Sequence, residues 1–317
     1  MGCAISRFFH ASGKPTDDIT DESSSSLCLN LENSIDSWIS ETKRTLTTIA
    51  ECPAEASETS NLPPWLLQEL LDENDSDFQM KTVSSSLGNK TNQDFLIKGV
   101  PRRPLYKDVA LRLLQWSRLC NQKESAIQRL MVSAERINFE EISDRATTSF
   151  HALTPPGSVE ALGLWLQQVD TFSILRLLGM RHTIGSDGAL IPSRQRLLQA
   201  CRAIHTPNRS QLSVAARARS KHAHRGRTRS FFGVAKGPAG VQNNDTEIIL
   251  LRLFDTAIWI NRHRFVGLGE GAVAIEIRVL EGYGARWVLN TIDNAVTFRG
   301  FLEPQMKDGH ANKWRHC

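Results

Sequence analysis

The hydrophobic pattern changes its period near residue 270, and this change constrains the fold more than any other feature. Before it, apolar residues recur at helical spacing, whereas Val273, Ile275 and Ile277 alternate with other residues as in a β-strand. Residues 285–289 and 296–302 predict two further strands of a meander. Helices first and strands last predict an α+β fold, with a helical N-terminal and central part followed by a C-terminal antiparallel sheet.

Helices are expected over most of the chain before this point. The expected ranges are 35–51, 64–71, 107–137, 158–169, 193–204, 210–221 and 245–261, with residues 173–180 continuing the packing. Ser158 and Ser210 are placed to cap two of these helices. The helix at 245–261 is apolar nearly all round, so we expect it to be buried. The glycines at 267–271 precede a strand and do not fit a dinucleotide-binding loop, so they indicate a turn.

Charge divides the chain unevenly. Residues 1–100 hold 7 basic and 16 acidic side chains, and residues 101–317 hold 31 basic and 18 acidic ones. We therefore interpret 1–34 as an acylated flexible tether, 35–100 as an acidic, partly helical and linker region, and 101–317 as a basic α+β domain. The positive charge of that domain favours a polyanionic ligand such as a phosphate compound, nucleic acid or an acidic membrane surface.

Composition excludes several classes of protein. Of the 317 residues 40% are hydrophobic and 23% are charged, which excludes a wholly disordered, collagen-like or multi-span membrane protein. The six cysteines form no close pairs, and we interpret them as reduced thiols. The longest apolar stretch, 248–260, contains Arg252 and Asp255 and is shorter than the roughly 20 residues that a spanning helix needs. No transmembrane helix is expected.

The first residues carry an acylation pattern. Gly2 follows Met1, Ser6 stands at the position that myristoylation favours, and Cys3 can accept palmitate. This start resembles that of dually acylated signalling proteins such as Src-type kinases and G-protein α subunits. One myristoyl chain binds a bilayer weakly, so a second chain is needed for stable anchoring. The pattern predicts a lipid anchor in the inner leaflet, on the cytoplasmic face of a membrane, and a cytosolic protein if acylation does not occur.

A basic window without any acid follows in the centre of the chain. Residues 194–236 contain eleven Lys and Arg and three His, and no Asp or Glu. On a helix, Arg217 and Lys221 share a face that His224 would join, with Arg225 beside it. Such a face could bind an anion through guanidinium groups, with Phe231–Phe232 as a stacking surface for a base. The alternative is a solvated basic loop that complements a helix dipole.

The catalytic candidates are His222, His224, Glu303 and His310, in which a histidine would act as acid or base opposite a carboxylate. Arg286 joins Arg217, Lys221 and Arg225 as a candidate ligand-binding residue. No metal-ligand spacing supports a metal site, and no cofactor is expected. The alternative for the C-terminal aromatic residues Trp287, Phe298, Phe301 and Trp314 is a place in the core.

Three stretches carry a resemblance to a group of eukaryotic proteins without an assigned activity. They are Lys-His-Ala-His-Arg at 221–225, Gly-Tyr-Gly-x-Arg-Trp at 282–287, and Phe-x-Gly-Phe-Leu-Glu-Pro at 298–304 with the Gly-His and Trp-x-His that follow. The likeness covers about residues 155–316. It implies a shared site without naming its ligand, and this chain departs from the group at 290–295 and in its terminal Cys317.

Three hypotheses follow for function. The first is a membrane-anchored cytosolic protein whose basic domain binds, with or without turnover, a phosphorylated small molecule or lipid head group. The second is binding of RNA or single-stranded nucleic acid through the basic window. The third is a membrane-tethered scaffold without catalysis, in which the helices of Trp38 and Trp65 recruit a protein partner.

Overall fold

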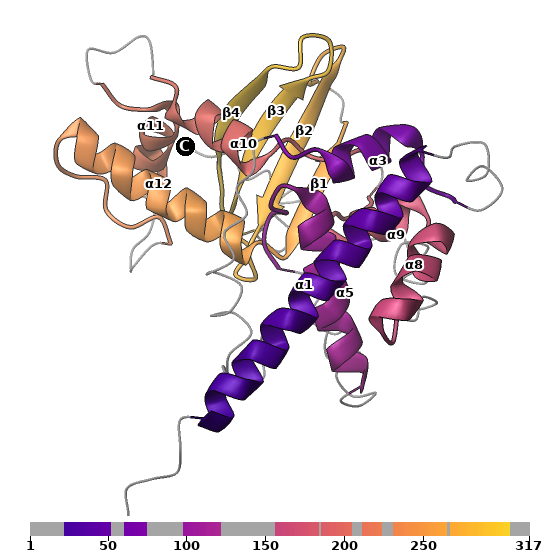
Figure 1. Cartoon of the computed structure of the whole chain (residues 1–317). Coiled ribbons are helices and arrows are strands. Elements are labelled where there is room, and N and C mark those ends of the chain that lie inside the picture. Colours follow the sequence, from indigo (N-terminus) through magenta and orange to yellow (C-terminus); the bar gives the residue numbers. More distant parts are fainter. Residues whose placement is uncertain are drawn as a thin grey trace, which may run out of the picture.

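The computed structural model describes residues 22–51, 60–74, 98–121, 156–183, 185–204, 211–223, 231–264 and 267–304. Within this part the α+β prediction is confirmed, because helices precede a four-stranded antiparallel sheet of order β1-β2-β3-β4 (Figure 1). The helices are α1 (Glu22–Glu51), α3 (Pro64–Leu71), α5 (Leu105–Asn121), α8 (Val159–Gln168), α9 (Thr171–Leu177), α10 (Arg194–Arg202), α11 (Val214–Ala223) and α12 (Ala239–Thr256). The strands are β1 (Trp259–His263), β2 (Ala272–Arg278), β3 (Gly284–Asn290) and β4 (Val296–Leu302).

The helix starts follow local capping chemistry. Ser158 accepts a hydrogen bond from the backbone N–H of Ala161 and caps α8 as predicted. The cap of α11 is Ser213, whose hydroxyl accepts from the N–H of Ala216, and not Ser210 as predicted. At the N-terminus, α1 begins at Glu22, inside the segment interpreted as a tether. The predicted helix at 107–137 corresponds to α5 up to residue 121, and the rest lies outside the described residues.

The prediction for residues 245–261 is wrong at its C-terminal end. Helix α12 ends at Thr256, and Trp259–His263 form β1. Pairing with β2 decides this, since Trp259 lies opposite Arg278 and His263 opposite Ala274. The expected burial also holds for one face only. Leu250, Leu253 and Phe254 are buried, whereas Ile248 is 58% exposed.

One face of the sheet packs on helices. Trp287 of β3 is fully buried, its indole N–H donates to the carbonyl of Leu197 in α10, and its ring lies 5.9 Å from that of Phe254 in α12. Phe301 is also buried. The core interpretation of these C-terminal aromatic residues is therefore correct for both, while Trp314 lies outside the described residues. The opposite face of the sheet carries polar side chains and is described below.

The acidic N-terminal region joins the same core. Helix α1 packs against α3, α5 and α8 (Figure 1). Trp38, Leu66 and Leu70 are buried in one hydrophobic cluster that continues to β4, whereas Trp65 is 41% exposed. Most of the apolar surface that the scaffold hypothesis offered to a partner is therefore used inside this protein. In the described residues, no helix combines the length and apolar character needed to cross a membrane.

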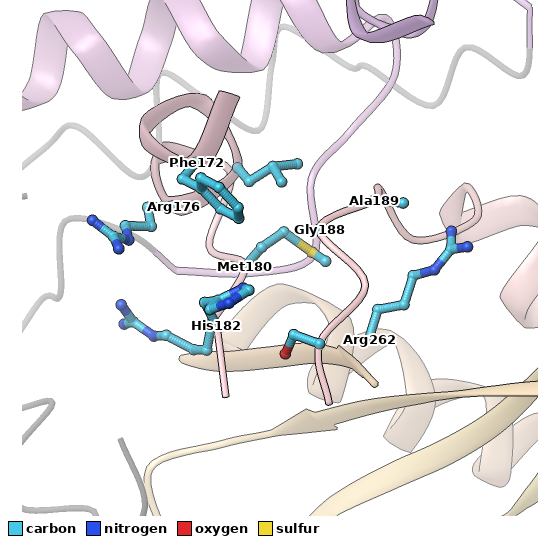
Figure 2. Close-up of a pocket in the computed structure, with 10 residues that line it drawn as sticks. Phe172, Arg176, Met180, His182, Gly188, Ala189 and Arg262 are labelled. Atoms are coloured by element: carbon cyan, nitrogen blue, oxygen red, sulfur yellow. The ribbon is translucent and has the colours of Figure 1, made fainter. Parts of the chain in front are cut away.

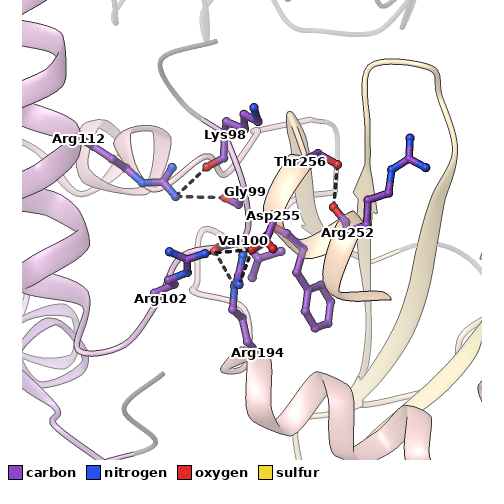
Figure 3. A network of polar contacts seen from close by, with 10 residues as sticks. Lys98, Gly99, Val100, Arg102, Arg112, Arg194, Arg252, Asp255 and Thr256 are labelled. Atoms are coloured by element: carbon purple, nitrogen blue, oxygen red, sulfur yellow. Dashed lines mark hydrogen bonds and ion pairs between the residues drawn. The ribbon is translucent and has the colours of Figure 1, made fainter. Parts of the chain in front are cut away.

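A short segment, residues 98–102, joins the helices to the sheet (Figure 3). The buried guanidinium of Arg112 in α5 donates to the carbonyls of Gly99 and Leu177 and pairs with Asp108 at 2.8 Å. From the other side, Arg194 of α10 donates to the carbonyl of Val100 at 3.0 Å. The segment also bonds the end of α12 through its own N–H groups. One arginine on each side thus holds the connection between the two halves.

Replacing Arg112 by alanine tests this connection. The change leaves the Asp108 carboxylate and two backbone carbonyls buried without their donor, and breaking a buried pair in this way costs about 3 kcal/mol of unfolding free energy. Urea unfolding should therefore show a large loss for Arg112→Ala. The matched control is Arg44→Ala on α1, which removes an exposed ion pair and should not change stability measurably. Equal losses in both variants would contradict the role of Arg112.

Candidate functional site

Helix α11 and strand β4 bring together two of the predicted residues. His222 lies in the last turn of α11, and Glu303 follows β4 directly. His222 Nδ1 lies 2.7 Å from Glu303 Oε1, and both side chains are partly buried. A carboxylate only accepts hydrogen bonds, so Nδ1 carries the proton and donates it. This arrangement fixes the tautomer and leaves Nε2 as the acceptor of the neutral ring.

The backbone carbonyl of Glu303 links this pair, which packs beside Phe301, to charged residues on the polar face of the sheet. The buried guanidinium of Arg278 donates to the backbone carbonyl of Glu303 at 3.0 Å and to Glu276 Oε1 at 2.7 Å. The other oxygen of Glu276 accepts two bonds from Arg286, at 3.0 and 2.7 Å. We call His222, Glu276, Arg278, Arg286 and Glu303 the sheet-face network. It is continuous from α11 to the centre of the sheet.

The network combines a buried anion with a solvent-facing cation. Glu276 is 4% exposed, whereas 36% of the Arg286 side chain is exposed. Because Glu276 binds both guanidinium groups, it fixes their positions on the strands. Arg286 lies opposite Gly300, and the register shift next to it leaves Arg299 as an extra residue in β4. A side chain at Gly300 would meet no atom within 4 Å, so the space beside Arg286 is open.

The structure places the other predicted residues as follows. Arg217 and Lys221 are exposed on α11, and neither makes an ion pair with another described residue. His224, Arg225 and His310 lie outside the described residues. Arg286 joins the sheet-face network and not the basic face of α11. The sequence leaves open whether the basic window and the C-terminal part converge, and the structure brings them into contact at His222 and Glu303.

The paired phenylalanines do not form the predicted stacking surface. Phe232 is buried and packs against His222, Phe301 and Tyr283. Phe231 stacks on Tyr283 with ring centroids 4.7 Å apart, and the guanidinium of Arg252 lies over the Phe231 ring. Both rings are therefore used in packing within the protein, and their contacts support the position of His222.

Sequence reasoning missed Glu276 and Arg278. In an alternating strand, charged residues normally lie on the solvent face, and the pattern at 273–279 predicts that position for Glu276 and Arg278. Both side chains are instead almost fully buried. The signal that could have identified them is Arg286 in the neighbouring strand, because a carboxylate between two arginines on one sheet face forms a buried charge cluster that needs mutual neutralisation.

Two observations limit other chemistry in the described part of the chain. No group of three His, Cys, Asp or Glu side chains there has the arrangement of metal ligands. Cys201 is a free, buried thiol, and burial raises its pKa to about 12, so it is not a reactive nucleophile. The sheet-face network is therefore the main candidate site: its histidine can transfer a proton, and its guanidinium groups can bind an anion.

Comparison with known proteins places this network in a recognisable segment. A protein-family model described as a CdiA C-terminal tRNase toxin domain matches residues 202–303. The match covers about a third of the chain and includes every residue of the network. No curated protein and no solved structure matches the chain. The similarity is compatible with a nucleic-acid-binding function.

The pH dependence of stability is expected to report on the polar face of the sheet. Burial lowers the pKa of His263 on β1, with Arg286 adding to this effect and Glu276 and Asp187 opposing it. In the unfolded chain His263 is protonated below about pH 6.5, whereas in the folded protein its protonation requires a lower pH. The unfolding free energy therefore falls as the pH drops below about 6.5. Urea unfolding from pH 7 to 5 should show a smaller decline for His263→Gln. Identical slopes in both proteins would contradict this account.

Proposed function

We propose that the chain binds RNA across the polar face of the sheet and cleaves it by general acid–base catalysis at the sheet-face network. The observation that carries the proposal is the contact between His222 and Glu303 beside Arg278, inside the segment similar to a tRNase toxin domain. RNA is favoured over a small anion by the similarity of this segment to a tRNase toxin domain, and the partly exposed Arg286 opposite Gly300 is open to a phosphate group.

Each residue of the network has a proposed role. Arg286 donates hydrogen bonds to a phosphodiester oxygen, since its planar guanidinium suits phosphate. Glu276 and Arg278 are positioning residues, because one fixes Arg286 and the other fixes the backbone of Glu303. Glu303 holds the His222 ring through Nδ1, and Nε2 acts as general base. Arg217 and Lys221 supply positive charge for the rest of the backbone.

The reaction that fits this set is attack by the ribose 2′-hydroxyl on the adjacent phosphorus. His222 Nε2 takes the proton of the 2′-hydroxyl while its oxygen forms the new bond to phosphorus. The bond from phosphorus to the 5′ oxygen breaks, and that oxygen takes a proton from solvent. The products are a 2′,3′-cyclic phosphate and a 5′-hydroxyl end, and His222 returns its proton to solvent. Arg286 offsets the charge on the phosphoryl oxygens during the step.

Cleavage of tRNA and of a synthetic single-stranded RNA tests the proposal. His222→Gln should lower kcat by about 100-fold or more, because it removes the general base. Glu303→Gln should lower kcat less, and Arg286→Gln should mainly raise KM. A single 2′-deoxy substitution at the cleaved position should abolish cleavage there. The products are identified by mass spectrometry from their cyclic phosphate.

Arg44→Gln on α1 serves as the control, since it removes one exposed positive charge far along the chain from the network. Urea unfolding of each variant shows that it is folded. Cleavage by His222→Gln at the rate of the unsubstituted protein, or cleavage of the 2′-deoxy substrate, would overturn the proposed mechanism. RNA binding without salt dependence would overturn the assignment of RNA as the ligand.

We also propose that the chain is acylated at Gly2 and Cys3, which lie outside the described residues. In eukaryotic cells, Gly2→Ala should abolish incorporation of labelled myristate and release the protein from the membrane fraction. Cys3→Ser should keep the myristate but weaken membrane association, because a single chain binds with a constant of only about 10⁴ M⁻¹. Cys28→Ser is the matched control and should behave as the unsubstituted protein. Myristate incorporation into Gly2→Ala would contradict the prediction.

A further inference from the structure

A second polar site lies at the edge of β1, outside the sheet-face network. It is a shallow pocket, open to solvent, between α9 and residues 180–189 (Figure 2). Its polar and aromatic lining is Phe172, Arg176, Arg181, His182, Ser186 and Arg262. Figure 2 shows Arg176 and Arg262 on opposite sides, with Met180 and His182 between them.

The pocket has an excess of positive charge. Three arginines line it, and no acidic side chain does. Arg262 is neutralised by Asp187 at 2.8 Å. Arg181 donates to the carbonyl of Ile258 at 3.3 Å, and burial together with the nearby charge of Arg176 lowers its pKa. Burial also lowers the pKa of Arg176, and the nearby charge of Asp170 opposes this effect. Two partly desolvated guanidinium groups that line one pocket favour an anion there.

An aromatic ring borders the same pocket. Phe172 is 45% exposed, and its ring meets His182 edge to face at 5.0 Å. Gly188, whose φ of +67° favours glycine, lies beside this ring, and a Cβ there would be in ordinary contact with Phe172 at 3.6 Å. An exposed ring beside paired arginines suits a base with its attached phosphate.

The pocket connects to the sheet-face network through one side chain. Ser186 in its wall donates to Asn261 Oδ1 at 2.8 Å, and Asn261 is the direct partner of Glu276 between β1 and β2. Residues 180 and 260 form a parallel bridge, so the pocket lies one strand beyond β1. The distance from Arg286 on β3 to the pocket corresponds to three strand spacings, or about 14 Å. A strand of RNA can span this distance with a few nucleotides.

We propose that this pocket is a second RNA subsite, which holds a phosphodiester through Arg176 and Arg181 and stacks the attached base on Phe172. The inference rests on the proposed RNA-cleaving function and adds to it a preference for substrates long enough to reach the pocket. Dinucleotides are then poor substrates because they engage the sheet-face network alone.

Binding and cleavage are measured separately. Binding uses fluorescence anisotropy with a twelve-nucleotide 2′-O-methyl RNA, which cannot be cleaved through a 2′-hydroxyl. Arg181→Gln should weaken this binding about tenfold and lower the salt dependence by about one phosphate contact. Phe172→Ala should weaken it about fivefold or more without changing the salt dependence. Arg44→Gln is the charge-matched control. In cleavage, Arg181→Gln should raise KM for the long RNA and leave kcat/KM for a dinucleoside phosphate unchanged.

The outcomes distinguish this subsite from the proposed reaction. Binding that depends on Arg181 and Phe172 without any cleavage by the unsubstituted protein supports the subsite and overturns the reaction. Cleavage with unchanged RNA binding in both variants overturns the subsite alone. Because Phe172 is exposed, Phe172→Ala keeps the test valid if Arg181→Gln does not fold. A free nucleoside monophosphate that binds in an Arg181-dependent manner more tightly than the RNA would assign the pocket to a free nucleotide and overturn the subsite.

Discussion

The hydrogen bonding of residues 98–102 between Arg112 and Arg194 is the constraint on which the rest of the structure depends. The helices α1, α3, α5, α8 and α9 pack mainly among themselves, and the sheet packs on α10, α11 and α12. Segment 98–102 passes between these groups and offers its carbonyls to a buried guanidinium on one side and a partly buried one on the other. Arginine suits this place because one side chain supplies several donors in a fixed plane. Without it, buried carbonyls would remain unsatisfied at a large cost.

That connection fixes the end of α12 and the start of β1, and therefore the sheet. Once β1 is fixed, strand pairing places three polar residues side by side on one face of the sheet. They are Asn261 on β1, Glu276 on β2 and Arg286 on β3. Helix α11 is fixed separately by Arg219, whose buried guanidinium donates to the carbonyls of Phe232 and Val234. The contact between His222 and Glu303 thus depends on two independent anchors. A proton-transferring pair needs such support, because small displacements of a catalytic group cost much of its rate.

The sequence predicted the elements better than the site. Strands β2, β3 and β4 and the cap of α8 follow from local pattern, since hydrophobic period and capping chemistry act over a few residues. Strand β1 was missed because its apolar residues continue the helix before it, and only pairing with β2 makes Trp259 to His263 extended. The same limit applies to Glu276. Its burial is set by Arg278 and Arg286, and contact across strands leaves no signal in a single alternating pattern.

The segment similar to the tRNase toxin domain begins at Arg202, the last residue of α10, and ends at Glu303. It contains the sheet-face network but only Arg262 of the pocket, whose other walls come from residues 172–189. The helical part that precedes the segment therefore has two effects on the proposed site. It fixes the position of the sheet through residues 98–102, and it builds a cationic pocket one strand beyond β1. Catalysis and the binding of a long substrate can thus depend on different parts of the chain. Proton transfer requires exact geometry within one network, whereas affinity for a polyanion is the sum of separate contacts.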